Sequence, residues 1–340
     1  MFSRPLLLSA FACCCSVGMQ VQAAPGDIYA GTLSHHNVLR FTPAGAQSTA
    51  VDGPFADAVT FDRFANLFIA DTQLNSVVRV TPSGSISTFA ANVAAAAFAF
   101  DREGNLLVAD AATNSVLKYT PAGVRSTLFP NVSAPTGLAV DGDGNTFVSE
   151  SATNRILKFS PSLVRSTFAA DLSVPHGLAF DAAGSLYVAD FGSDSVVKFL
   201  PNGARSVFAV QQSGVRHLAF APTGDLFAAA YTAQVIRRIS PNGGVSDLAS
   251  GLVVGGVAVE PEITAPRITS ISRLPNGNIL LRGLCSPNST TTVLEAAPNV
   301  IGGGSFALLA PVAPDASGVF SFEDGASSLL NRRFYRLLTP

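Results

Sequence analysis

PHGLAFDAAGSLYVADFGSDSVVKFLPNGARSVFA, residues 175–209, is the stretch that decides the fold, because similar text recurs along the chain. Related copies begin at Asp57, Ala96 and Thr136, and a weaker copy begins at Arg216. The period is about 40 residues, set by the aspartates that end the first apolar run of each copy, Asp62, Asp101, Asp141 and Asp181. Such a period is typical of helical arrays or of four-stranded propeller blades.

The content of each copy favours blades. Short runs rich in Val, Phe, Leu and Ile are broken every few residues by Gly, Pro, Asn or Asp, and none supports a helix of three turns. In the copy from Pro175 we predict four strands, at 177–180, 185–189, 196–199 and 205–209. Leu178 alternates with the small Ala179, which suits the narrow inner end of a wedge-shaped blade, so the first strand is predicted to be innermost.

The two ends of the repeat region supply one further blade. Residues 27–50 match only the last three strands of a copy, and residues 255–260 match only the first. Joined, they close the ring and leave no exposed sheet edge. We therefore predict an all-β chain, with a six-bladed β-propeller and a split closing blade over residues 24–260. Residues 261–266 read as a proline-bounded linker, and residues 267–340 as a small β-sandwich.

The N-terminus predicts export. An apolar run over residues 5–17 follows Arg4 and leads to small residues around Ala23, so residues 1–23 are predicted to be a signal peptide cleaved near Ala23. The run is too short to span a bilayer, and we expect a secreted or periplasmic chain without a transmembrane helix once mature. A lipoprotein acylated within residues 13–15 is the alternative, although Phe11 stands where a small residue is expected.

Charge limits the class of partner. Only 13% of the residues are charged, the formal net charge is −2, and lysines and arginines form no cluster. Nucleic-acid binding depends on many phosphate contacts from Lys and Arg, so we expect no nucleic-acid partner.

The segments PHGLAFD at 175–181 and GSLYVAD at 184–190 resemble the NHL repeat and the related repeats of the gluconolactonase and streptogramin-lyase superfamily. The resemblance covers residues 26–260 and implies a six-bladed propeller. The functions it implies are diverse: protein and RNA binding, lactone hydrolysis and antibiotic ring opening. For the hydrolases it implies calcium or another divalent ion held by Glu, Asn and Asp, and for the lyases His and Glu with magnesium near the channel mouth.

In a propeller of this topology, the loops before the innermost strand and after the second strand share one face, where function usually gathers. The residues at the start of the inner strands are Asp57, Ala96, Thr136, His176, Arg216 and Gly255, and His217 replaces a glycine of the motif. From these we predict a ligand-binding face that consists of Asp57, Thr136, Glu150, His176, Arg216, His217 and Tyr231.

Two functions remain open at this point. His217 and His176 are the candidate catalytic residues, and Asp57, Glu150 and His176 are the candidate ligands of a Ca or Mg ion if the chain is a lactonase-type hydrolase or a streptogramin-type lyase. Arg216 would repel such a cation, and a histidine beside glycine at a strand start is often structural. We therefore expect a binding or scaffold module for a protein, peptide or small ligand, without a cofactor.

Acidic residues at the ends of the second strands form a repeated pattern. Each is followed four residues later by Asn or Asp, in the pairs Asp71 and Asn75, Asp110 and Asn114, Glu150 and Asn154, and Asp190 and Asp194. Asp and Asn side chains accept hydrogen bonds from nearby backbone amides in turns. Because the pattern repeats in four copies, we predict that each pair closes its own turn rather than binding a ligand.

Overall fold

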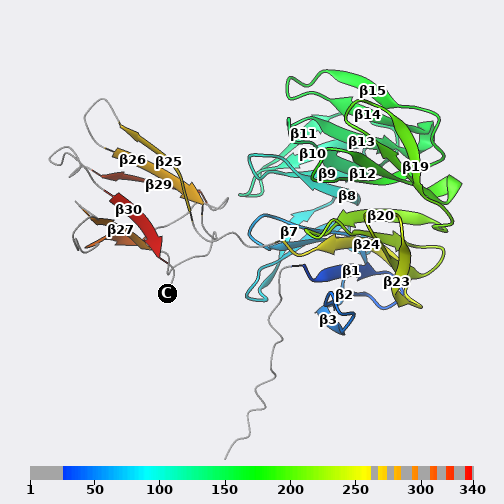
Figure 1. The fold of residues 1–340 in the computed structure, drawn as a ribbon, viewed down its shortest axis with the longest axis horizontal. Helices are drawn as coiled ribbons and strands as arrows, with labels where there is room; N and C mark the ends of the chain where they lie inside the picture. The colour runs from blue at the N-terminus through cyan, green and yellow to red at the C-terminus, as the bar shows by residue number, and fades with distance from the viewer. Residues whose placement is uncertain are drawn as a thin grey trace, which may run out of the picture.

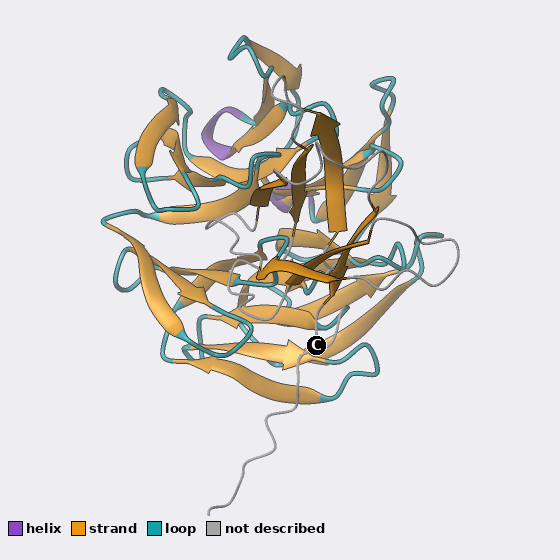
Figure 2. Ribbon diagram, turned by 90° about the vertical axis from the view of Figure 1, so that its left-hand side faces the viewer, coloured by secondary structure: helices purple, strands orange, loops and turns teal. Residues whose placement is uncertain are grey.

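The computed structural model describes residues 26–261 continuously and six further strands between residues 267 and 338. The predicted signal peptide and residues 262–266 of the predicted linker lie outside the described residues. Regular structure is almost entirely β-strand, with two single turns of 3-10 helix, Ser151–Thr153 and Phe191–Ser193 (Figure 2). Within the described ranges, no helix has the length and apolar character needed to cross a membrane.

Residues 26–260 form six four-stranded antiparallel sheets arranged as propeller blades (Figure 1). Blade 1 consists of β4 (Ala56–Phe61), β5 (Leu67–Asp71), β6 (Ser76–Val80) and β7 (Ile86–Ala91). Blade 2 consists of β8 (Ala95–Phe100), β9 (Leu106–Asp110), β10 (Ser115–Tyr119) and β11 (Arg125–Phe129). Blade 3 consists of β12 (Pro135–Val140), β13 (Thr146–Glu150), β14 (Arg155–Phe159) and β15 (Arg165–Ala169).

The remaining three blades follow the same plan. Blade 4 consists of β16 (Pro175–Phe180), β17 (Leu186–Asp190), β18 (Ser195–Phe199) and β19 (Arg205–Ala209). Blade 5 consists of β20 (Val215–Phe220), β21 (Leu226–Ala230), β22 (Val235–Ile239) and β23 (Val245–Ser250). Blade 6 joins β24 (Val254–Val259) to β1 (Ile28–Thr32), β2 (Asn37–Phe41) and β3 (Gln47–Asp52). The strand order β24-β1-β2-β3 confirms the predicted split blade.

The split blade is held by a ladder between the two ends of the propeller. Ile28 pairs with Val259 and Tyr29 with Ala258 in antiparallel register. The amide of Gly26 donates to the carbonyl of Glu260 at 3.0 Å, which extends the ladder beyond the strands. The pairing removes the free edges that an unclosed blade would expose.

The inner strand of blade 4 begins two residues earlier than the sequence predicted. This strand, β16, starts at Pro175, which pairs with Asp190. A proline fits the first position of a strand because its missing N–H costs the ladder little there.

Small residues let the inner strands approach one another around the axis. A Cβ at Gly137 would lie 2.1 Å from the carbonyl oxygen of His176, and a Cβ at Gly177 would lie 2.7 Å from that of Arg216. Larger side chains next to them pack between blades: Leu138 and Leu178 are 4% and 7% exposed. Each such side chain contributes roughly 1.5 to 3 kcal/mol when fully buried. This supports the prediction that the first strands are innermost.

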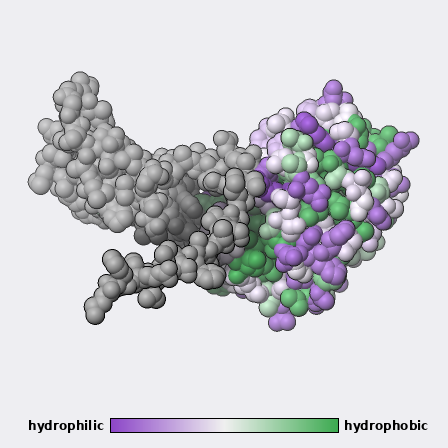
Figure 3. All heavy atoms as spheres, turned by 90° about the horizontal axis from the view of Figure 1, so that it is seen from below, coloured by the Kyte–Doolittle hydropathy of each residue, from purple (hydrophilic) through white to green (hydrophobic). Residues whose placement is uncertain are grey.

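The core consists of apolar clusters between neighbouring blades. One cluster joins Phe147 and Ile156 of blade 3 to Leu186, Val188 and Phe199 of blade 4. The outermost strands face solvent and expose Ile86, Val207 and Val245, and Val124 and Val164 are exposed directly before two of them. The propeller surface seen in Figure 3 accordingly mixes hydrophilic and hydrophobic residues in small areas.

The described strands after residue 266 form two three-stranded antiparallel sheets. One has the order β25 (Arg267–Arg273), β26 (Ile279–Leu284), β29 (Val319–Asp324), and the other β28 (Ala307–Pro311), β27 (Val293–Ala297), β30 (Phe334–Leu338). These six strands occupy the segment predicted to be all-β. That the two sheets pack as a sandwich stays a prediction.

Candidate functional site

The inner strands share a backbone irregularity at their upper ends, where the upper face is the one at which inner strands begin and second strands end. In each inner strand the register of pairing with the next strand shifts across the second residue. A β-bulge leaves one residue outside the ladder and redirects its side chain. The residues at these bulges are Asp57, Ala96, Thr136, His176, Arg216 and Gly255, the set that the sequence placed at the mouth of the axis.

Arg216 and Asp57 form an ion pair between blades 5 and 1, which are separated by blade 6. Arg216 Nη1 lies 3.0 Å from Asp57 Oδ1, and Nη2 lies 3.4 Å from Oδ2. The intervening bulge residue is Gly255, where a Cβ would lie 2.6 Å from the Cα of Asp57. The guanidinium carbon also lies 5.1 Å from the centroid of the Tyr231 ring, a cation-π distance.

His176 lies beside this pair and is neutral at pH 7. Burial lowers its pKa to about 4, the charge of Arg216 and the nearby His217 act in the same direction, and Asp57 opposes them. The His176 ring lies 5.0 Å from the ring of Phe191, which caps it from the turn after β17. The structure thus brings Asp57, His176 and Arg216 together from three blades.

His217 follows the bulge in β20 and occupies the position that Ala or Gly fills in the other inner strands. Burial lowers its pKa to about 4, and Arg216 acts in the same direction, whereas a hydrogen bond with the backbone of Ala96 raises it. Blade 2, which carries Ala96, is three blades away from blade 5 in a ring of six. The imidazole therefore spans the axis.

Below the mouth, the axis contains a cavity of about 250 Å³, and His217 is one of its lining residues. All six inner strands line it, through residues that include Val59, Ala97, Gly137, Gly177, His217 and Val257. The volume corresponds to about eight water molecules at ~30 Å³ each. The lining contains none of Asp57, His176, Arg216 and Tyr231, so this cavity is distinct from the mouth.

The other predicted face residues have different surroundings. Thr136 Oγ1 donates to the carbonyl of Pro175 at 2.9 Å, which ties blade 3 to blade 4. Tyr231 is 37% exposed and presents its ring beside Arg216.

Glu150 is fully buried and belongs to a separate network. Its carboxylate accepts hydrogen bonds from the Arg155 Nε, from Arg165 Nη2 at 3.3 Å and from the Ser133 amide at 2.7 Å. Burial raises its pKa, but these hydrogen bonds outweigh that effect and the pKa lies below its usual value. None of these partners belongs to the mouth, so the structure does not join Glu150 to the two histidines.

The acidic residues at the second-strand ends act in turns, as predicted. Asp71 accepts from the amide of Gln73, and Asp110 from that of Ala112, both at 3.1 Å. The partner residues extend further than the sequence suggested, because they bind the loop that leads to the following blade. Their side chains accept from the next loop in the pairs Asn114 with Ala134, Asn154 with Val174 and Asp194 with Gly214.

Sequence reasoning missed three features of the site. The bulges leave no mark in composition, the Ala96 backbone offers no side-chain signal, and Phe191 stands in a turn where the other copies have Thr, Ala, Ser, Tyr or Leu. Among the described residues, no group of three or more His, Cys, Asp and Glu side chains has a metal-binding arrangement.

Comparisons with known proteins agree with the resemblance and the fold. The NHL repeat family model matches residues 172–199, which include β16, β17 and β18. No curated protein matches the sequence.

Solved structures of similar fold have low identity. Virginiamycin B lyase from Staphylococcus aureus is 14% identical, with a TM-score of 0.54, over 76% of this chain and 88% of that one. A chain of a nidogen/laminin complex is 16% identical, with a TM-score of 0.62, over 70% of this chain and 98% of that one. An auxiliary nutrient binding protein from Bacteroides ovatus is 12% identical, with a TM-score of 0.51, over 76% and 74%. At these identities the likeness shows the fold alone.

Proposed function

We propose that the chain is an exported binding module that holds a small polar ligand, or a polar group of a peptide or protein, at the upper mouth of the axis. The observation that carries the proposal is the Arg216–Asp57 pair, closed across Gly255 beside a neutral His176. The pair offers both hydrogen-bond donors and acceptors, and Tyr231 adds an exposed ring. Small-ligand sites typically combine an enclosed space with a few polar groups of this kind.

The basicity of the histidines favours binding over acid–base chemistry. An effective general base has a pKa near the working pH, and the pKa of about 4 at His176 and His217 lies well below neutrality. Asp57 is also paired with a guanidinium, whose charge opposes a divalent cation at the same place. The mouth residues therefore fit the calcium or magnesium of the implied hydrolases and lyases poorly.

Solved structures of this fold include a nutrient binding protein and a chain of a protein complex, which supports a binding role. The predicted signal peptide supports action outside the cytoplasm.

The test is a binding screen on the mature chain. Glucose, a neutral dipeptide and δ-valerolactone represent the polar ligand classes, and isothermal calorimetry or amide NMR shifts report binding. We expect a hit whose affinity falls about tenfold or more in Arg216→Ala, because a charge-assisted hydrogen bond is lost. Asn202→Ser, in a turn of blade 4 away from the mouth, is the matched control and should bind like the wild type.

A lyase or lactonase is the second candidate, favoured by the closeness of His176 and His217, because His217 contributes to the lowered pKa of His176. Turnover of δ-valerolactone or of a streptogramin B antibiotic, abolished in His217→Ala and dependent on added Mg²⁺ or Ca²⁺, would overturn the binding proposal.

A further inference from the structure

Aromatic residues form repeated groups of three between neighbouring blades, near the face opposite the mouth. Each group joins a second strand, a fourth strand and the inner strand of the next blade. The groups are Phe68, Phe89 and Phe100; Phe147, Phe168 and Phe180; and Tyr187, Phe208 and Phe220. Their ring centroids lie between 4.9 and 5.4 Å apart in edge-to-face geometry.

A lysine covers two of these groups. Lys158 Nζ lies 5.4 Å from the ring centroid of Phe147, and Lys198 Nζ lies 4.8 Å from that of Tyr187. The third group, between blades 1 and 2, has Arg79 in the equivalent place. Arg79 Nε is buried and has no hydrogen-bond partner within the described part of the chain. A buried guanidinium nitrogen without an acceptor carries a substantial desolvation cost.

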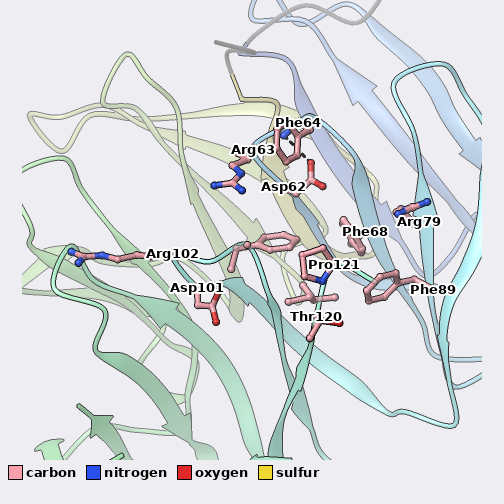
Figure 4. A pocket seen from close by; sticks show the side chains of 13 residues that line it. Asp62, Arg63, Phe64, Phe68, Arg79, Phe89, Asp101, Arg102, Thr120 and Pro121 are labelled. Carbon is pink, nitrogen blue, oxygen red and sulfur yellow. Dashed lines mark hydrogen bonds between the residues drawn. The ribbon is translucent and has the colours of Figure 1, made fainter. Parts of the chain in front are cut away.

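Beside Arg79, a cavity of about 160 Å³ lies over the rings of Phe68, Phe89 and Phe100 (Figure 4). The turn at Gly104, which lines this cavity, has different surroundings from the equivalent turns of the other blades. A Cβ added at Gly144, Gly184 or Gly224 would lie 3.4 to 3.8 Å from a proline side chain of the same blade. A Cβ added at Gly104 would instead lie 3.5 Å from Nη2 of Arg63, which belongs to blade 1. Pro121, the corresponding proline of blade 2, lines the cavity.

The charges around the cavity favour an anion. Arg63, Arg79 and Arg102 line it, together with two carboxylates, Asp62 and Asp101. Both carboxylates have further partners, although the charge of Arg79 also acts on Asp62. Asp101 Oδ2 lies 2.9 Å from Lys118 Nζ. Asp62 accepts hydrogen bonds from the amides of Phe64 and Asn66, both at 2.9 Å.

We propose that this cavity binds a small molecule with one aromatic ring and one carboxylate, with the ring on the three phenylalanines and the carboxylate at Arg79. The size fits, because a cavity of about 150 Å³ accommodates benzene. Edge-to-face contacts with the phenylalanines favour an aromatic ring over an aliphatic group. The carboxylate would pair with the charged guanidinium of Arg79, which lines the cavity. This site is separate from the mouth and independent of the function proposed for it.

The test uses benzoate as the probe, titrated into the full mature chain and followed by amide NMR shifts. We expect saturable binding with shifts centred on Phe68, Phe89 and Gly104. Arg79→Gln should weaken binding about tenfold or more, because it removes a charge-assisted hydrogen bond. Lys158→Gln, the matching change in blade 3, should leave the affinity unchanged, and benzyl alcohol should bind more weakly than benzoate.

A second variant guards against misfolding of the first. Thr120→Leu narrows the cavity with a residue that blade 4 carries at the equivalent place, Leu200, so the fold should tolerate it. It too should weaken benzoate binding. Absence of saturation at millimolar benzoate, or equal affinity in the wild type and Arg79→Gln, would overturn the proposal.

Discussion

The bulges of the inner strands and the turns after the second strands lie on the same face of the propeller, but their residues vary in opposite ways. The turns repeat an acidic residue and an Asn or Asp, and both side chains bind backbone amides. The bulges carry six different residues, and three of them, Asp57, His176 and Arg216, interact across blades. Residues that repeat in four of the blades maintain the turns, and residues that occur once are available to a ligand.

The largest expected contrast lies within blade 3. Glu150→Ala should lower the free energy of unfolding by about 3 kcal/mol, because it removes a buried carboxylate that binds Arg155, Arg165 and the Ser133 amide. Thr136→Ala, at the bulge of the same blade, should cost about 1 kcal/mol for one hydrogen bond. Urea unfolding measures both. Equal losses would erase the distinction between turn and bulge.

We expect acid to lower the stability of the fold through the histidines His176 and His217. The pKa of His176 and of His217 is about 4 in the folded chain, below the usual value of about 6.5. Between pH 6.5 and 4 the unfolded chain therefore binds protons that the folded chain does not, and stability falls as the pH falls through this window. We expect a loss of about 2 kcal/mol from the two histidines, because both residues keep some exposed surface.

Urea midpoints at pH 7, 5.5 and 4 measure this loss. The double variant His176→Gln with His217→Gln should show a flatter dependence on pH. An unchanged slope would assign the acid sensitivity to carboxylates elsewhere.

We expect the stability of the contact between blades 3 and 4 to depend on one acceptor atom, the side-chain oxygen of Asn154. Asn154 has a left-handed φ of 54° and accepts from the Val174 amide at 2.9 Å. Asn154→Ala loses the acceptor and strains the backbone, and should cost about 1.5 kcal/mol. Asn154→Asp keeps the acceptor, as Asp194 does in blade 4, and should be nearly neutral. Thermal unfolding compares the two, and a neutral alanine variant would show that the acceptor contributes little.

The smallest effect is expected at the Arg216–Asp57 pair. The two side chains are 24% and 16% exposed, and ion pairs open to solvent contribute less than about 1 kcal/mol. A double-mutant cycle with Arg216→Gln and Asp57→Asn gives the coupling free energy. A coupling above about 2 kcal/mol would make the pair part of the framework and would weaken its assignment to a ligand.

The fold was predictable because its signals are local. The period, the turn residues and the partial copies at both ends determine six blades and the split closure, and the structure agrees. The bulges were not predictable, because strand length and composition do not reveal which residue leaves the ladder at His176.

Contacts that form only when the blades close into a ring could not be predicted from the sequence either. Arg216 meets Asp57 only because Gly255 leaves room between blades 5 and 1. At the cavity over Phe68, Arg63 of blade 1 lies beside Gly104 of blade 2, and neither copy alone predicts that contact.

The closing ladder also brings the first and last residues of the propeller next to each other. Gly26 and Glu260 are joined by a hydrogen bond of 3.0 Å, so a short peptide linker between them would complete a loop of chain. New termini could then be cut at the Asn202-Gly203 turn, which is exposed and distant from both candidate sites. Such a circular permutant would turn the split blade into a continuous one and make blade 4 the split blade, with the order of blades around the axis preserved.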